Sequence, residues 1–472
     1  MRVISTEVLV IGSGAGGATT AVRLAEAGRV VTIVEEGPAV DPDAMEPFSL
    51  DEMVAKYRHG GGAGALGLPP IAYTEGRCVG GSTEVNSGLW HRVPVELTER
   101  WRRHYEIAEF DPDTLDRYAE GIEAELEVSS LPGPPPRSSA VLDDGATKLG
   151  WRSVEFPRVF RYDQHGRGVK QTMARTFLPR ATAASATLLP DCRVTRLERN
   201  GSRVSGARAQ LGRPDGTVED VVLQADQVFV CGGAIHSPAL LQRSGIRRSI
   251  GRGLKLHPTI KIAARFPFAL DHDGVAMHRI TEFAPNFTIG GSISRRGHVA
   301  MALAEAGEPS DDALADWHNV GVYYAAIRSE GSGRVLSLPG LASPLVTYRL
   351  TPNDFSKLAQ GLVALGEALL AAGATELYPS VTGAGVARSR GDLGRWWDAV
   401  TPRAANLMTV HLTSSIRMSE RQDLAGTDSF GRVHGYDNLR VNDASLLPDA
   451  PGVNPQAGVM AIAARNADHF LA

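Results

Sequence analysis

A glycine-rich turn between a short apolar strand and a helix is the feature that most constrains this chain. Residues 7–11 (EVLVI) are apolar and β-branched, as expected of a strand buried on both faces. The turn Gly12-Ser-Gly-Ala-Gly-Gly17 follows, and residues 18–25 repeat small apolar side chains at helical spacing. A second strand over residues 30–34 ends at Glu35, which completes a βαβ unit.

Each glycine of this unit has a physical reason to be there. Gly12 permits the tight turn, Gly14 lets the backbone approach a pyrophosphate, and Gly17 lets the helix pack on the strand. Glu35 lies 23 residues beyond Gly12, the spacing of a carboxylate that accepts hydrogen bonds from a ribose diol. The unit therefore predicts a dinucleotide site. It leaves NAD and FAD open, and the alternative is a turn that only packs a helix.

Length and charge exclude several classes of function. The chain has 472 residues, a formal net charge of −4 and 22% charged residues, typical of a globular enzyme with more than one lobe. A charge near neutrality argues against nucleic acid or an anionic membrane as the main partner. The longest apolar stretch, residues 362–374, is interrupted by Gly366 and Glu367, so we predict no membrane segment.

The cysteines indicate a reducing compartment. Cys78, Cys192 and Cys231 are too few and too far apart for a disulfide framework, and they lack metal-ligand spacing. The first strand starts almost at Met1, so no signal peptide is expected. We predict a cytoplasmic protein that binds no metal.

Several further elements can be placed from the pattern. Residues 98–128 and 355–373 favour helices, and four strand-like segments lie between residues 187 and 230. The strand at 228–231 runs through two glycines into a helix, for which we predict Ser237 as N-cap.

The segment Gly76-Arg-Cys-Val-Gly-Gly-Ser-Thr-Glu-Val-Asn-Ser87 resembles the first signature of the glucose–methanol–choline (GMC) oxidoreductases, which bind FAD. Other blocks of that family have counterparts in order along the chain, although residues 260–400 match loosely. They are residues 228–245, 254–258, 411–418 (HLTSSIRM), 431–448 and 452–455. The long-chain alcohol oxidase and sugar dehydrogenase branches look most similar.

The resemblance implies an α/β fold with a discontinuous, Rossmann-like FAD-binding domain. Residues 1–100, 185–260 and 429–472 would form that domain. Residues 101–184 and 261–428 would form a sheet-and-helix substrate domain built from the insertions.

The resemblance also implies roles for individual residues. His411 matches the catalytic base of the family, and an imidazole can take a proton near neutral pH. Asn454 matches its partner, which binds the substrate oxygen; the alternative is that Asn454 only caps the last helix, with Pro455 in its first turn. The cofactor residues implied are Gly12, Gly14, Gly17, Glu35, Gly80, Gly81, Ser82, Asn86, Val194, Asp443, Ala444 and Gln456.

Two positions depart from the family pattern. Ser414 replaces a usual glycine, so the turn after His411 is expected to differ. Val85 stands where some members carry the histidine that attaches FAD covalently, which predicts non-covalent FAD. Further candidates for the pocket are His91, His257, His278, His434, Glu84 and Glu282, although a structural role is favoured for His257 and His434.

The expected function is FAD-dependent oxidation of a primary alcohol to the carbonyl, with hydride transfer to flavin N5 and O2 or another electron acceptor. A sugar-like or secondary-metabolite alcohol is the first expectation for the substrate, and a long-chain aliphatic or sterol alcohol is the alternative. Other classes also remain: a lyase with a non-redox flavin, a flavoprotein subunit that passes electrons to a partner, and an NAD-dependent dehydrogenase.

Overall fold

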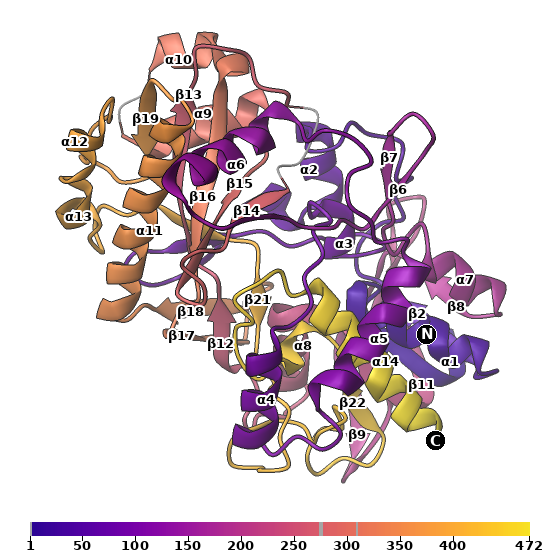
Figure 1. The fold of residues 1–472 in the computed structure, drawn as a ribbon. Helices are drawn as coiled ribbons and strands as arrows, with labels where there is room; N and C mark the ends of the chain where they lie inside the picture. The colour runs from indigo at the N-terminus through magenta and orange to yellow at the C-terminus, as the bar shows by residue number, and fades with distance from the viewer. Residues whose placement is uncertain (1, 273–276, 308–309) are drawn as a thin grey trace.

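A seven-stranded sheet, drawn mainly in indigo and magenta in Figure 1, contains the two strands that flank the glycine turn and its helix near the N-terminus. The computed structural model describes residues 2–272, 277–307 and 310–472. The strand order is β8-β2-β1-β11-β10-β9, with β22 beside β11. The strands are β1 (Arg2–Ile11), β2 (Val31–Val34), β8 (Thr187–Leu189), β9 (Cys192–Asn200), β10 (Arg203–Gly212), β11 (Val218–Val230) and β22 (Leu439–Val441).

The core of this sheet is parallel. β1 pairs in parallel with β2 and β11, and β8 and β22 extend the parallel set, whereas β9 and β10 are antiparallel. Helices α1 (Ala15–Glu26) and α14 (Gln456–Leu471) pack against each other although they come from opposite ends of the chain. The predicted α/β class and discontinuous Rossmann-like domain are confirmed.

A nine-stranded sheet forms the second lobe, with order β3-β4-β20-β13-β16-β15-β14-β5 and β19 beside β13. Its strands are β3 (Ala63–Ala65), β4 (Ile71–Tyr73), β5 (Ser153–Glu155), β13 (Thr259–Arg265), β14 (His278–Ile280), β15 (Phe287–Gly291), β16 (Val320–Ile327), β19 (Glu376–Pro379) and β20 (Leu407–Thr409). A four-stranded sheet, β18-β17-β12-β21, adjoins it: β12 (Arg252–Leu256), β17 (Ser332–Leu336), β18 (Leu345–Arg349) and β21 (Leu412–Thr413).

One face of the nine-stranded sheet is an apolar core. Ile260, Ala325, Ile289 and Ile280 lie abreast on four neighbouring strands and are all fully buried. They pack under α11 (Pro352–Ala371) and α6 (Arg137–Leu149). Because side chains alternate along a strand, the next row of residues points to the opposite face, toward the other lobe.

The other elements are short. The hairpin β6 (Phe160–Tyr162) and β7 (Gly168–Lys170) stands apart. The remaining helices are α2 (Leu50–Lys56), α3 (Ser82–Val85), α4 (Val95–His104), α5 (Pro112–Glu125), α7 (Phe177–Ala183), α8 (Gly233–Arg243), α9 (Arg296–Glu305), α10 (Asp311–Ala315), α12 (Arg390–Leu393) and α13 (Trp396–Ala399). Within the described residues, no helix combines the length and hydropathy needed to cross a membrane.

The strands can be compared with the predicted domains. Residues 1–100, 185–260 and 429–472 contain every strand of the seven-stranded sheet. However, β3 and β4 lie in the first of these segments and pair within the nine-stranded sheet. The boundaries of the two domains stay a prediction.

Two helix predictions were wrong in detail. The helix expected over residues 98–128 is two helices, because Asp111 caps a new one: its side chain accepts from Thr114 N at 2.9 Å. Ser237 is not an N-cap, since α8 already begins at Gly233 and Pro238 lies inside it. Pro238 cannot bond the carbonyl of Ala234 four residues back, and the Ser415 hydroxyl donates to that carbonyl instead, at 2.6 Å.

Candidate active site

A cavity of about 670 Å³ is lined by residues of both large sheets. One end is formed by the turn after β1 and the end of β2, and the segment 74–88 lines the cavity as far as the start of α14. The other end is formed by β13 to β16, residues 408–412 and the segment before α14.

At the first end, two glycine segments far apart in the sequence meet backbone to backbone. A Cβ on Gly81, whose φ is +55°, would lie 2.8 Å from the Cα of Gly14. Beside this contact, the backbone N–H of Gly80 donates to Ser13 Oγ at 3.0 Å. Because neither glycine has a side chain, only backbone faces the cavity at this contact. A pyrophosphate requires such a surface.

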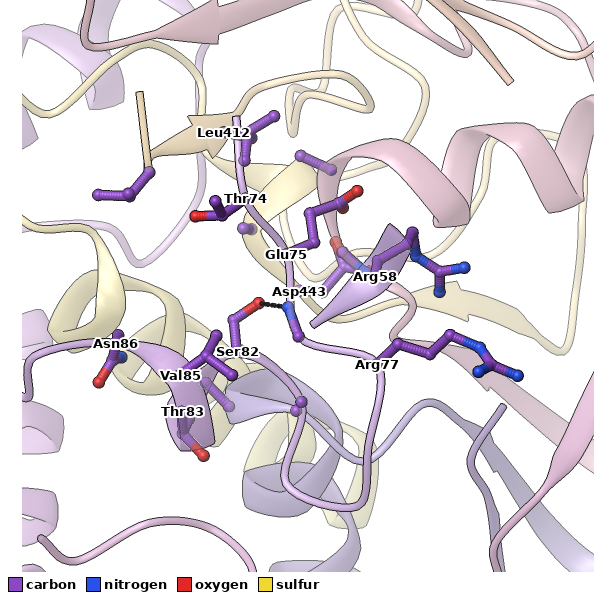
Figure 2. A pocket seen from close by; sticks show the side chains of 18 of the residues that line it. Arg58, Thr74, Glu75, Arg77, Ser82, Thr83, Val85, Asn86, Leu412 and Asp443 are labelled. Carbon is purple, nitrogen blue, oxygen red and sulfur yellow. Dashed lines mark hydrogen bonds between the residues drawn. The ribbon is translucent and has the colours of Figure 1, made fainter. Parts of the chain in front are cut away.

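Acidic and basic groups surround this cradle. The Glu35 carboxylate accepts from Ser13 Oγ at 2.7 Å and from the backbone N–H of Ser13 and of Gly37, and burial raises its pKa. Burial would also raise the pKa of Glu36, but the hydrogen bond and charge of Arg58 lower it to about 2. Figure 2 shows Arg58 beside the segment that runs from Thr74 to Asn86, and Arg77 within that segment.

Within that segment, a hydrogen bond fixes the start of the short helix α3. The Ser82 hydroxyl accepts from the backbone N–H of Gly76 at 3.0 Å, drawn dashed in Figure 2. Asn86, at the end of α3, donates to Gln456 Oε1 at 2.7 Å and so ties the segment to the first residue of α14.

Most of the residues predicted for the site line this cavity. They are Gly12, Gly14, Glu35, Gly81, Ser82, Asn86, Val194, His411, Asp443, Ala444, Asn454 and Gln456. Gly17 and Gly80 lie behind it: a Cβ on Gly17 would be 2.0 Å from the Gly12 carbonyl oxygen. The Asp443 carboxylate accepts from Gly233 N and Ser237 Oγ and from both donors of Ser445, so it ties β22 to α8.

At the second end, two imidazoles face each other. The Nδ1 atoms of His257 and His411 are 2.9 Å apart, and Gly452 N–H donates to His257 Nε2 at 2.9 Å. His257 therefore carries its proton on Nδ1 and donates it to His411 Nδ1, which leaves the proton of neutral His411 on Nε2.

The environment keeps both rings neutral. Burial, then the charges of Arg279 and Arg328, lower the pKa of His257 to about 3. Burial, then His257 and Arg279, hold the pKa of His411 well below its usual value.

Asn454 lies beside this end of the cavity with an unused acceptor. Its Oδ1 is buried and has no hydrogen-bond partner among the residues that the structure describes. The helix α14 begins at Gln456 after Pro455, with no side-chain cap, so the reading of Asn454 as an N-cap was wrong. A buried amide oxygen without a partner indicates a site for a donor supplied by a ligand.

Of the other histidines proposed for the pocket, only His257 lines it. His91 packs on Phe156, His278 bonds Ser139 and His434 bonds a backbone carbonyl. The acids Glu84 and Glu282 also lie outside it. Sequence reasoning missed Lys261, Arg279 and Tyr324, which line the cavity from a segment without any motif.

The turn after His411 keeps the backbone that a glycine would favour. Ser414 has a φ of +71°, so the serine adopts the left-handed conformation. Ser414 therefore differs from the usual glycine in having a side chain, and its backbone conformation is one that glycine also adopts. The Ser414 hydroxyl donates to Thr413 Oγ1 at 3.0 Å.

The cavity fits FAD. The bare glycine cradle would hold the pyrophosphate, and the start of α14 with Gln456 would face the isoalloxazine. Family models agree: an FAD binding domain matches residues 7–42, and GMC oxidoreductase models match residues 53–259 and 329–463.

Individual relatives extend the match over the whole chain. A GMC-type oxidoreductase of Sinorhizobium fredii is 40% identical over 99% of this chain and 95% of its own length. A long-chain-alcohol oxidase of Arabidopsis thaliana is 26% identical over 98% of this chain and 67% of its own. The solved structure of pyridoxine 4-oxidase from Mesorbium loti superposes with a TM-score of 0.74 at 22% identity, covering 99% of both chains. The chain belongs to the GMC oxidoreductase family and is an FAD-dependent oxidoreductase.

Proposed function

We propose that this enzyme oxidises an alcohol to a carbonyl compound at the His411 end of the cavity, with Asn454 as the second group that holds the hydroxyl. The observation that supports this most is that the Asn454 Oδ1 acceptor, which has no partner among the described residues, and the His411 Nε2–H donor line the same cavity. An alcohol hydroxyl accepts and donates one hydrogen bond each, so it satisfies both.

Oxidation also needs a base for the hydroxyl proton. His411 is the candidate because Asn454 has no basic atom at working pH. In the hydrogen-bonded state described above, Nε2 of His411 carries a proton. A lone pair there requires the His411 proton on Nδ1 and the His257 proton on Nε2, so the hydrogen bond from Gly452 N–H has to be given up. His257 is thus a positioning residue that sets the tautomer of His411. When bound, FAD supplies the acceptor for the carbon-bound hydride.

Three polar side chains in the cavity wall support the choice of substrate class. Lys261, Tyr324 and Arg279 face this end of the cavity. Such a wall favours a polar alcohol, sugar-like or from secondary metabolism, and disfavours a long aliphatic chain. The Arabidopsis thaliana relative acts on long-chain alcohols, which makes a long-chain alcohol the second candidate.

We also propose that FAD is bound without a covalent link. Val85 lines the cavity at the position where covalent members carry histidine, and an aliphatic side chain forms no such bond. Acid precipitation of the protein is expected to leave a yellow supernatant; a yellow pellet contradicts the proposal.

Anaerobic mixing with a panel of alcohols tests the function. Polar primary alcohols are expected to bleach the flavin absorbance, with the carbonyl product formed in equal amount. Bleaching by fatty alcohols alone supports the second candidate. A lyase cleaves its substrate without bleaching, and no bleaching by any alcohol contradicts alcohol oxidation. Admitting air then shows by the rate of re-oxidation whether O2 is the acceptor.

A further inference from the structure

A row of side chains crosses the cavity face of the nine-stranded sheet. Lys261 on β13, Tyr324 on β16, Gly290 on β15 and Arg279 on β14 are register partners on four consecutive strands. Residues directly abreast in an antiparallel sheet share a face, so this row lies on the side opposite the buried isoleucines.

Gly290 makes room for a contact between the residues on either side of it. A Cβ at this position would lie 2.8 Å from the Tyr324 hydroxyl, so the tyrosine ring reaches across β15 only because position 290 is a glycine. The Tyr324 hydroxyl then accepts from Arg279 Nη2 at 2.8 Å. This hydrogen bond holds the guanidinium in place against the cavity wall.

Arg279 is a buried charge whose Cζ lies 5.8 Å from the centroid of the Tyr324 ring and which has no carboxylate partner among the described residues. It is 3% exposed, its Nε has no partner, and no carboxylate pairs with it among residues 2–272, 277–307 and 310–472. Lys261, in the same row, is neutralised by Glu305 at 2.7 Å. Arginine stays ionised in proteins, and a buried charge is costly unless it is paired.

The Arg279 guanidinium lies close to the end of the cavity where His257 and His411 meet. Its charge lowers the pKa of His91, His257 and His411 after burial has already done so, which places it within electrostatic reach of all three rings. Arg279, Tyr324, His257 and His411 all line the same cavity. An anion bound at Arg279 would therefore belong to the molecule whose hydroxyl meets His411.

We propose that the substrate is an alcohol that also carries a carboxylate, and that Arg279 binds this carboxylate through its guanidinium while His411 and Asn454 hold the hydroxyl. The planar fork of arginine matches a carboxylate with two parallel hydrogen bonds. The inference rests on the proposed function. In the reaction, one C–H and one O–H bond of the alcohol break, the hydride goes to FAD and the proton to His411, and the carboxylate is unchanged.

Two matched alcohols test the proposal in the holoenzyme. 4-(Hydroxymethyl)benzoate and 4-methylbenzyl alcohol share the reacting group and differ in the carboxylate. The wild type is expected to be reduced more efficiently by the acid, and Arg279→Met to lower that preference about tenfold or more. Arg279→Lys keeps the charge and is expected to retain part of the preference. Arg390→Met, an exposed site on α12, removes the same charge and is expected to change nothing.

Binding of benzoate gives a readout that needs no turnover. Calorimetric titration is expected to detect benzoate binding to the wild type and to Arg390→Met, and to find it about tenfold or more weaker in Arg279→Met. A wild type that neither prefers the acid nor binds benzoate overturns the proposal without reliance on any variant. Equal losses of Arg279→Met on both alcohols overturn it too. Failure of the proposed function looks different: no alcohol reduces the flavin, whether or not benzoate binds.

Discussion

His257 and His411 are joined by a hydrogen bond of 2.9 Å between their Nδ1 atoms. The Gly452 N–H donates to the far nitrogen of His257, so the direction of the whole chain of hydrogen bonds is set by one backbone group. Burial excludes water from both rings, and the neighbouring His257 lowers the pKa of His411 further, which keeps His411 neutral. A neutral imidazole is the form that a base must have before it accepts a proton.

The pH dependence of flavin reduction should reflect this relationship. Because the pKa of His411 lies well below its usual value, the reduction rate of the wild type is expected to stay level as the pH falls through 6.5. His257→Phe removes a neighbour that lowers this pKa, so the pKa rises and the rate begins to fall at a higher pH. Stopped-flow reduction from pH 5 to 9 measures the shift.

A control separates this effect from a general loss of histidine. His165→Asn changes an exposed histidine and is expected to leave the profile where it is. If the profiles of wild type and His257→Phe coincide, His257 does not tune His411.

Removal of the base itself should be more severe. His411→Ala is expected to slow flavin reduction by roughly 10²-fold or more, the usual contribution of a general base. The variant should retain its flavin, because the glycine cradle lies at the other end of the cavity. Single-turnover reduction at saturating alcohol measures the loss. A rate equal to that of the wild type would falsify the assignment of His411.

The contact between the two glycine segments predicts that a side chain at Gly81 weakens FAD binding. Gly81→Ala places a Cβ 2.8 Å from Gly14 Cα, so the cradle must open. Gly201 is a matched control: its φ is +58°, close to the +55° of Gly81, but nothing lies within 4 Å of its Cβ position. Both alanine variants should be destabilised by their positive φ, Gly81→Ala the more so because its ψ of −142° lies outside the left-handed helical region. Only Gly81→Ala should also bind FAD at least tenfold more weakly, measured by titration of the apoprotein. Equal flavin affinity in the two variants contradicts a cradle at Gly81.

The nucleotide end of the cavity could be predicted from the sequence because its function resides in the backbone. Gly12 and Gly81 lie where two segments approach too closely for a side chain. Such positions require glycine, so they produce a characteristic glycine spacing that can be recognised in the sequence. The position of His411 in the cavity was also predicted, from a block of neighbouring residues, and its role as the base stays a prediction.

Arg279 and Tyr324 at the second end of the cavity could not be predicted, because they meet through pairing between strands. Arg279 and Tyr324 lie 45 residues apart and come together only through the register of β14, β15 and β16. Nothing in the local sequence indicates that register. The predicted start of α8 was wrong for a related reason. Serine is a residue type that often caps helices, yet the Ser237 hydroxyl donates to Asp443, which comes from the far end of the chain.

Asn454 offers a prediction that separates a ligand contact from a structural role. Its Oδ1 has no partner in the described part of the chain, and no side chain caps α14, so Asn454→Ala should leave the melting temperature nearly unchanged. The loss of one hydrogen bond to the substrate should raise the Kd of the alcohol roughly tenfold, at about 1.4 kcal/mol. Concentration dependence of anaerobic reduction gives this Kd, and thermal unfolding of the holoenzyme gives the melting temperature. If Asn454 capped the helix, the variant would instead lose about 1 kcal/mol of stability, with the Kd unaffected.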